Sequence, residues 1–206
     1  MREINKDKNK KEFKELLLSI NRDGIKDLVE YLETTDFYST PASTKYHNSV
    51  EGGLCDHSLN VYHNLLKLID TFGFADKFSN DSVKLVSLCH DIFKTDFYEF
   101  YLQNRKITEP NGHYEWVQVG AYKVREIEQR IVVGDPGFNS VFILNKFIKL
   151  TEPEMVAIIN CNLNVDSINN IPEYILEIYN RYPLAFLLHL ADYASICIDE
   201  NKYLYE

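Results

Sequence analysis

The stretch Leu85–Tyr98, LVSLCHDIFKTDFY, is largely apolar, yet it places His90, Asp91 and Lys94 within little more than one helical turn. Its apolar spacing predicts a helix over residues 81–94 that faces a core. Charged groups in such a helix are costly to bury unless they are paired or bind a metal. The stretch therefore raises the question of which other residues the fold brings to His90 and Asp91.

Two other predicted helices carry metal-binding types of side chain among apolar residues. His57 shares the apolar face of a helix predicted over residues 54–72, and Asp192 lies in a helix predicted over residues 183–198 that is apolar on almost every side. Imidazole and carboxylate ligands in a dry site suit a divalent cation, with Mn, Fe, Co or Ni favoured and Mg or Zn possible. The alternative is that each of these residues is a core residue satisfied by its own hydrogen bonds.

The rest of the chain predicts a mostly α-helical protein with a small β-hairpin. Alternating apolar and polar residues in HYEWVQV and AYKVREI, punctuated by the Asn-Gly pair before them and by Gly120, predict the hairpin around residues 113–133. The segment GDPGFNS is predicted as a loop. Further helices are predicted over residues 11–33 with a break near 21–24, over 139–150, over 153–163 with Thr151 as N-cap, and over 172–179.

Length and composition predict one domain with an ordinary hydrophobic core, since 45% of the 206 residues are hydrophobic. We expect a single domain over residues 1–206, with residues 1–34 as an N-terminal helical extension. No run of eighteen apolar residues is present and the N-terminus is too polar for a signal peptide, so we expect no membrane segment. Four cysteines without a CxxC pair are expected to be reduced thiols of a cytoplasmic protein.

The formal net charge of −9 indicates which partners the chain suits. Sequence-independent binding of long nucleic acid relies on a basic surface, so we expect none. A small phosphorylated substrate stays possible, because a metal ion and a few local cations can hold it. The composition leaves the oligomeric state open.

The order of the polar residues carries a family resemblance. EGGLCDHSLNVY, LCHDIFK and LLHLADYAS place a His, a His-Asp pair and a distant Asp on separate predicted helices. This ordered set resembles the HD-domain metal-dependent phosphohydrolases over about residues 37–200 and implies their all-α helical bundle. The segment FYSTPASTKYHNSVEGGLCDHSLNV is similar to a bacterial and phage subgroup, and to the HD domain of a bacterial 3′–5′ exoribonuclease.

The resemblance assigns roles to individual residues. It makes four residues the metal ligands: His57, His90, Asp91 and Asp192. It also implies catalytic roles for Asp91, for Lys94 beside a substrate phosphate, and for His47, which would contact phosphate or donate a proton. The spacing of Asp91 and Lys94 lets both face one cavity. The alternatives are an ordinary ion pair for Lys94 and a surface-loop position for His47.

The chain departs from relatives that bind two metals, which usually carry two further histidines. Pro136 in GDPGFNSV and Cys161 in AIINCNLN occupy the corresponding positions here. Proline has no side-chain donor, and Cys161 is expected to be a buried free thiol. We therefore expect one divalent ion per chain. His189, three residues before Asp192, could orient that carboxylate or hydrogen-bond to the backbone in the core.

These residues together predict metal-dependent hydrolysis of a phosphoester, on a nucleotide or a short oligonucleotide, through a metal-activated water. Two alternatives stay open. One is a catalytically idle HD domain that binds a nucleotide or a protein partner, because the two auxiliary histidines are missing. The other is an exonuclease acting on single-stranded RNA or DNA, against which the acidic charge counts.

Overall fold

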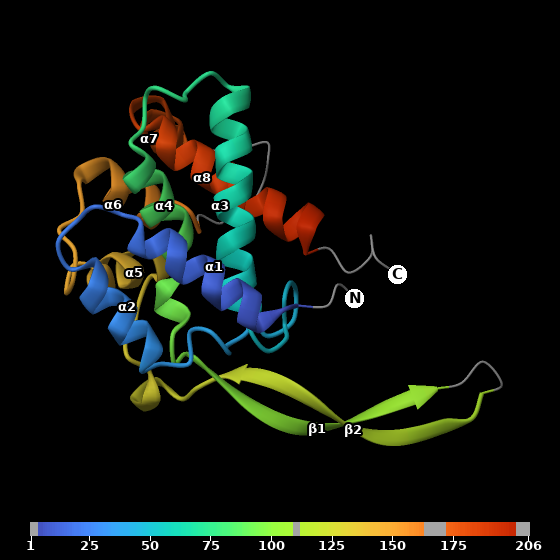
Figure 1. Cartoon of the computed structure of the whole chain (residues 1–206). Helices are drawn as coiled ribbons and strands as arrows, with labels where there is room; N and C mark the ends of the chain where they lie inside the picture. Colours follow the sequence, from blue (N-terminus) through green and yellow to red (C-terminus); the bar gives the residue numbers. More distant parts are fainter. Residues whose placement is uncertain (1–3, 109–111, 163–171, 201–206) are drawn as a thin grey trace.

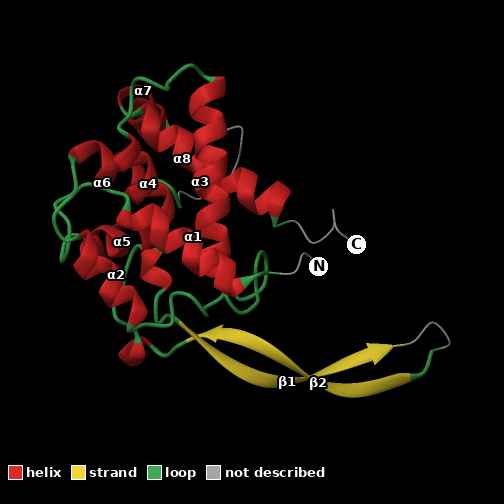
Figure 2. Ribbon diagram, in the orientation of Figure 1, coloured by secondary structure: helices red, strands yellow, loops and turns green. Residues whose placement is uncertain are grey.

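The computed structural model describes residues 4–108, 112–162 and 172–200. Helices form the body of the molecule, and one long β-hairpin projects from it (Figures 1 and 2). The predicted class, an α-helical protein with a β-hairpin insertion, is confirmed.

The elements have the following bounds: α1 Lys6–Leu18, α2 Ile25–Glu33, α3 Gly53–Thr71, α4 Asn80–Cys89, the 3-10 turn η1 Ile92–Lys94, β1 Tyr98–Thr108, β2 Tyr114–Val124, the 3-10 turn η2 Ile127–Gln129, α5 Pro136–Leu144, α6 Glu152–Ile159, α7 Glu173–Arg181, α8 Pro183–Ala194 and the π-helical turn η3 Ser195–Asp199.

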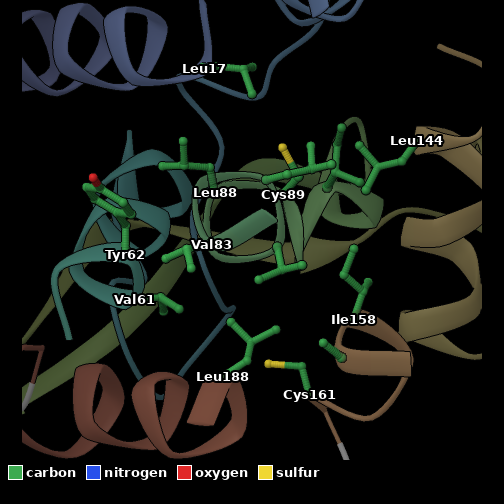
Figure 3. Packing of buried hydrophobic residues seen from close by; sticks show 14 of the residues in the cluster. Leu17, Val61, Tyr62, Val83, Leu88, Cys89, Leu144, Ile158, Cys161 and Leu188 are labelled. Atoms are coloured by element: carbon green, nitrogen blue, oxygen red, sulfur yellow. The ribbon is translucent and has the colours of Figure 1, made fainter. Parts of the chain in front are cut away.

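The longest helix, α3, lies at the centre of the body and packs against α1, α4 and α8. Buried side chains from these helices form one continuous core, part of which Figure 3 shows. Phe13 and Leu17 of α1 and Leu28 of α2 are fully buried in that core. The segment expected as an N-terminal extension therefore shares its core with the rest of the chain.

The hairpin lies earlier in the sequence than predicted, since residues 113–133 include only its second strand. Strand β1 pairs antiparallel with β2 from Tyr98 opposite Val124 to Thr108 opposite Tyr114. Gly120 is not a turn: it pairs with Leu102 in the middle of β2. A Cβ atom at Gly120 would lie 2.6 Å from the Phe100 ring, so the glycine makes room for an aromatic side chain across the strands.

Two predicted helix boundaries near the site are wrong. The predicted helix 81–94 ends at Cys89, and η1 follows after His90 and Asp91. The predicted loop GDPGFNS contains the first turn of α5, because the Asp135 side chain accepts hydrogen bonds from the backbone of Gly137 and Phe138 and Pro136 occupies the first turn.

Other helix ends differ by a few residues. The helix predicted to end at residue 150 ends at Leu144, and the one predicted over 183–198 is α-helical only to Ala194, where the π-helical turn begins. The helix predicted over 153–163 ends at Ile159, and residue 163 lies outside the described residues. The predicted N-cap Thr151 is confirmed and forms a capping box with Glu154.

All four cysteines are free thiols; Cys55, Cys89 and Cys161 are buried, whereas Cys197 is exposed. Within the described residues, no helix combines the length and the apolar character that crossing a membrane requires.

Candidate metal centre

Three helices bring four polar residues together. His57 lies in α3, Asp192 lies in α8, and His90 and Asp91 follow the last residue of α4. The Nε2 atom of His57 lies 3.1 Å from Oδ1 of Asp192 and 3.6 Å from Oδ2 of Asp91. The Nε2 atom of His90 lies 3.5 Å from Oδ2 of Asp91 and 3.9 Å from Oδ1 of Asp192. All four side chains are almost completely buried.

The two imidazole rings present the same nitrogen to the carboxylates. Nδ1 of His90 lies 2.9 Å from the carbonyl oxygen of Ser87, and Nδ1 of His57 lies 2.9 Å from Oε1 of Glu200. Neither Nε2 atom has a hydrogen-bond partner within residues 4–108, 112–162 and 172–200. Two buried imidazole nitrogens that make no hydrogen bond to these residues but lie within ion-pair distance of two carboxylates fit a metal ion.

The charges of the buried cluster also fit a divalent cation. Asp91, Asp192 and Glu200 contribute three negative charges, and Lys94 contributes one positive charge. With neutral imidazoles the balance is −2, which a divalent ion would cancel. Burial disfavours the charged form of His57, but the carboxylates of Glu200 and Asp192 outweigh it and raise the pKa of His57 to about 10. The metal-free cluster therefore carries a proton on His57 that metal binding would release.

Lys94 lies inside this cluster rather than at its edge. Its Nζ atom lies 2.5 Å from Oδ2 of Asp91, and the Asn162 side chain donates a hydrogen bond of 3.2 Å to the other oxygen, Oδ1. Burial lowers the pKa of Lys94, but the Asp91 carboxylate outweighs burial and raises it, so Lys94 stays charged. The ion pair expected as the alternative is thus present, and its partner is one of the candidate ligands.

The loop before α3 brings His47 to the site. The Ser43 hydroxyl accepts hydrogen bonds from the backbone N–H groups of Tyr46 and His47 and donates one to the His47 carbonyl oxygen. The His47 ring lies 5.1 Å from the His57 ring, and its Nε2 atom is buried without a partner in the described part of the chain. Burial lowers the pKa of His47 to about 4, so the imidazole is neutral near pH 7. His47 is therefore a partly buried loop residue whose ring lies beside that of His57.

Three further residues named in the sequence analysis, His189, Cys161 and Pro136, do not join the four candidate ligands. Nδ1 of His189 lies 2.7 Å from the carbonyl oxygen of Cys161, as expected for a core histidine bonded to the backbone. The Cys161 thiol is fully buried, and burial raises its pKa well above its usual value. Pro136 begins α5. Among the described residues, neither Cys161 nor a residue next to Pro136 belongs to a cluster that could hold a metal.

Sequence reasoning missed Glu200, which contacts His57 directly. Positions eight residues apart on one α-helix differ by about 80° around its axis, so the spacing from Asp192 gives no indication that both face one site. The π-helical turn Ser195–Asp199 has more residues per turn than an α-helix, so it shifts the direction of the side chains that follow α8. As a result, the Glu200 side chain points toward α3 and meets His57. No signal in the residue pattern could have shown this turn.

Comparison with known proteins gives one positive result. A family model described as HD domain matches residues 54–193, which contain His57, His90, Asp91 and Asp192 but neither His47 nor Glu200. No curated protein and no solved structure matches the chain. Members of this family are generally metal-dependent hydrolases. Because the match covers more than half of the sequence and includes all four residues that converge between α3, α4 and α8, the chain belongs to the HD-domain family.

Proposed function

We propose that this protein hydrolyses a phosphoester of a nucleotide or short oligonucleotide, with one divalent metal ion held by His57, His90, Asp91 and Asp192. The observation that carries the proposal is the pair of buried Nε2 atoms that make no hydrogen bond to any described residue and face two buried carboxylates, with a charged lysine beside them. A bound divalent ion would supply an acidic water and polarise a phosphoryl oxygen.

The residues around the ligands suit a phosphate group. Lys94 donates one of its three ammonium hydrogens to Asp91 and keeps two for phosphate oxygens, where it offsets negative charge in the transition state. Asn162 holds the other oxygen of Asp91, so two donors fix the orientation of that carboxylate. His47, as a neutral imidazole, can accept a proton or a hydrogen bond at Nε2. The adjacent Tyr46 is 77% exposed and offers a ring on which a base can stack.

The test combines metal analysis with turnover. The purified protein is loaded with Mn²⁺, and hydrolysis is measured on a model phosphodiester, a phosphomonoester and a set of nucleotides. We expect Mn²⁺-dependent turnover and about one equivalent of metal per chain, since four side chains with one or two waters suffice for one ion. Two well-occupied metal positions would contradict the mononuclear site.

A catalytically idle binding domain is the second candidate, because Pro136 and Cys161 stand where related proteins carry histidines. Full metal occupancy and nucleotide binding without turnover on any substrate would favour it. Competition by polynucleotide against mononucleotide at two salt concentrations separates an exonuclease from a nucleotide hydrolase, because only polynucleotide binding weakens steeply with salt.

A further inference from the structure

The Glu200 carboxylate is buried against one ring of the candidate centre. Its side chain has no exposed surface, and Oε1 lies 2.9 Å from Nδ1 of His57. The Asn60 side chain donates a hydrogen bond of 3.0 Å to the same oxygen. Glu200 is therefore a buried acceptor directed at the nitrogen of His57 that faces away from the other candidate ligands.

A row of polar residues on α3 holds the segment that carries Glu200. His57, Asn60 and Asn64 recur at helical spacing along one face of α3. Asn64 donates hydrogen bonds to the Ser195 hydroxyl, at 3.0 Å, and to Oδ2 of Asp199, at 2.6 Å. The π-helical turn is thus held to α3 at Ser195 and at Asp199, and Glu200, the next residue, is held by Asn60 and His57.

An imidazole that binds a metal through Nε2 must carry its proton on Nδ1. An acceptor at Nδ1 fixes that tautomer, holds the ring in orientation and makes the coordinating nitrogen more basic. We propose that Glu200 is a positioning residue that holds His57 as the Nδ1–H tautomer, so that Nε2 faces the metal position between His90, Asp91 and Asp192. This role rests on the metal site of the proposed function, but it adds a residue outside the family match.

The structure also offers a competing arrangement. His47, His57 and Glu200 each place one ligand atom within 4.8 Å of the others, and Oε2 of Glu200 has no partner in the described part of the chain. A metal bound there through Nδ1 of His57 would take the nitrogen that the proposal assigns to a hydrogen bond. The two arrangements predict opposite protonation of the His57 ring, which makes them separable.

The experiment uses the whole chain with Zn²⁺ as a diamagnetic probe. Long-range ¹H–¹⁵N spectra of the Zn²⁺-loaded protein report which nitrogen of His57 carries the proton, and competition with a chelator gives the Zn²⁺ dissociation constant. We expect His57 to show Nδ1–H. Glu200→Ala should raise the dissociation constant tenfold to a hundredfold, on the scale of lost hydrogen bonds to metal-binding histidines, and should expose the Nδ1 proton to exchange.

Two variants separate positioning from a general loss of structure. Glu200→Gln keeps an oxygen that can accept from Nδ1, so it should retain the Nδ1–H signal and lose less affinity than Glu200→Ala. Glu12→Ala removes the carboxylate that lies 2.9 Å from Nε2 of His63, an exposed residue of the same helix, and should leave the dissociation constant within twofold. If Glu200→Ala does not fold, the wild-type spectrum and the Gln variant still decide the question.

Several results overturn the proposal. One is a wild-type spectrum in which the Zn²⁺-loaded His57 carries its proton on Nε2. Another is a Glu200→Ala variant whose Zn²⁺ dissociation constant lies within twofold of wild type and whose spectrum is unchanged. Two equivalents of Zn²⁺ in the wild type, one of which is lost with Glu200, would establish the competing arrangement instead. No readout uses turnover, so an inactive protein with Glu200-dependent Zn²⁺ binding contradicts only the proposed activity, whereas a wild type that binds no Zn²⁺ contradicts both.

Discussion

Helix α3 supplies the histidines of two histidine–glutamate pairs that have the same nitrogen–oxygen distance but differ in burial. Nδ1 of His57 lies 2.9 Å from Glu200, and Nε2 of His63 lies 2.9 Å from Glu12. The first pair is almost fully buried, whereas the side chains of His63 and Glu12 are 49% and 34% exposed. Distance alone therefore does not distinguish the pairs. Burial does, because water screens the exposed pair while the buried groups must find all their partners within the protein.

The same contrast separates the other charged groups of the molecule. Lys94 pairs with Asp91 in the interior, and Lys123 pairs with Glu99 on the hairpin surface at a comparable distance of 2.7 Å. If burial sets the importance of such a contact, variants at buried sites should have large effects and their exposed counterparts small ones. Four predictions test this contrast, beginning with the largest expected effect.

The strongest effect is expected from removing a candidate ligand. His90→Ala and Asp91→Ala should each weaken metal binding more than about a hundredfold and reduce turnover by at least as much, because the remaining buried ligands lose a shared partner. Elemental analysis after dialysis and thermal unfolding with and without metal measure this. His63→Ala is the matched control, and metal content equal to wild type in both ligand variants would refute the site.

Removing Lys94 should affect turnover more than metal content. Lys94→Ala in the metal-loaded protein should lower turnover at least about tenfold, since one charged contact to the transition state is lost. Without metal the variant should also unfold at lower temperature than wild type, because Asp91 then stays buried without its cation. Lys123→Ala is the exposed control. A Lys94→Ala enzyme with normal turnover would leave the lysine with a structural role only.

The pair of buried Glu154 and partly exposed Arg22 tests the contrast away from the site. Burial raises the pKa of Glu154, but the hydrogen bond from Arg22 outweighs it and lowers the pKa. The pair therefore stabilises the fold above the unfolded-state pKa of about 4.3, and this contribution is lost as pH falls through the lower folded-state pKa. Glu154→Gln should cost about 2 kcal/mol of unfolding free energy at pH 7.

Urea unfolding of wild type and Glu154→Gln at pH 7 and near pH 3 measures that dependence. The difference between the two proteins should shrink at the lower pH, because pH 3 lies below the unfolded-state pKa of about 4.3 and part of the contribution of the carboxylate charge is then lost. A difference that stays constant across this range would show that the carboxylate charge does not stabilise the fold.

The smallest effect is expected at the exposed pair of Glu12 in α1 and His63 in α3. Glu12→Ala should change the free energy of unfolding by less than about 0.5 kcal/mol, because an exposed ion pair contributes little in water. Its effect should fall further when salt is raised, whereas the effect of Glu154→Gln should not. If Glu12→Ala lowered the free energy of unfolding by more than about 1 kcal/mol, burial would not explain the difference between exposed and buried pairs that the other three predictions assume.

The candidate ligands could be predicted from the sequence because each lies on, or directly after, a helix whose apolar spacing shows which face is buried. His57 follows the apolar stripe of α3, and Asp192 lies in a helix with almost no other polar residue. A charged group on such a face needs a partner, so the pattern indicated a shared site before any contact was known. The helical class followed from the same periodicity.

The remaining features depend on contacts between segments that are far apart in the chain. Strand β1 has a weak alternation of polar and apolar residues, and only its pairing with β2 shows where the hairpin begins and why Gly120 lies within a strand. His47 reaches the site through a loop that the Ser43 hydroxyl holds, and Glu200 reaches it through a π-helical turn.

Local periodicity thus determined which helix faces are buried and which residues on them need a partner. Tertiary structure alone decided that Glu200 is the partner of His57, although 143 positions separate them in the sequence. The physical reason is that helical spacing records the direction of a side chain relative to its own helix axis. The partner it meets depends on how α3 and the turn after α8 pack, which no local pattern encodes.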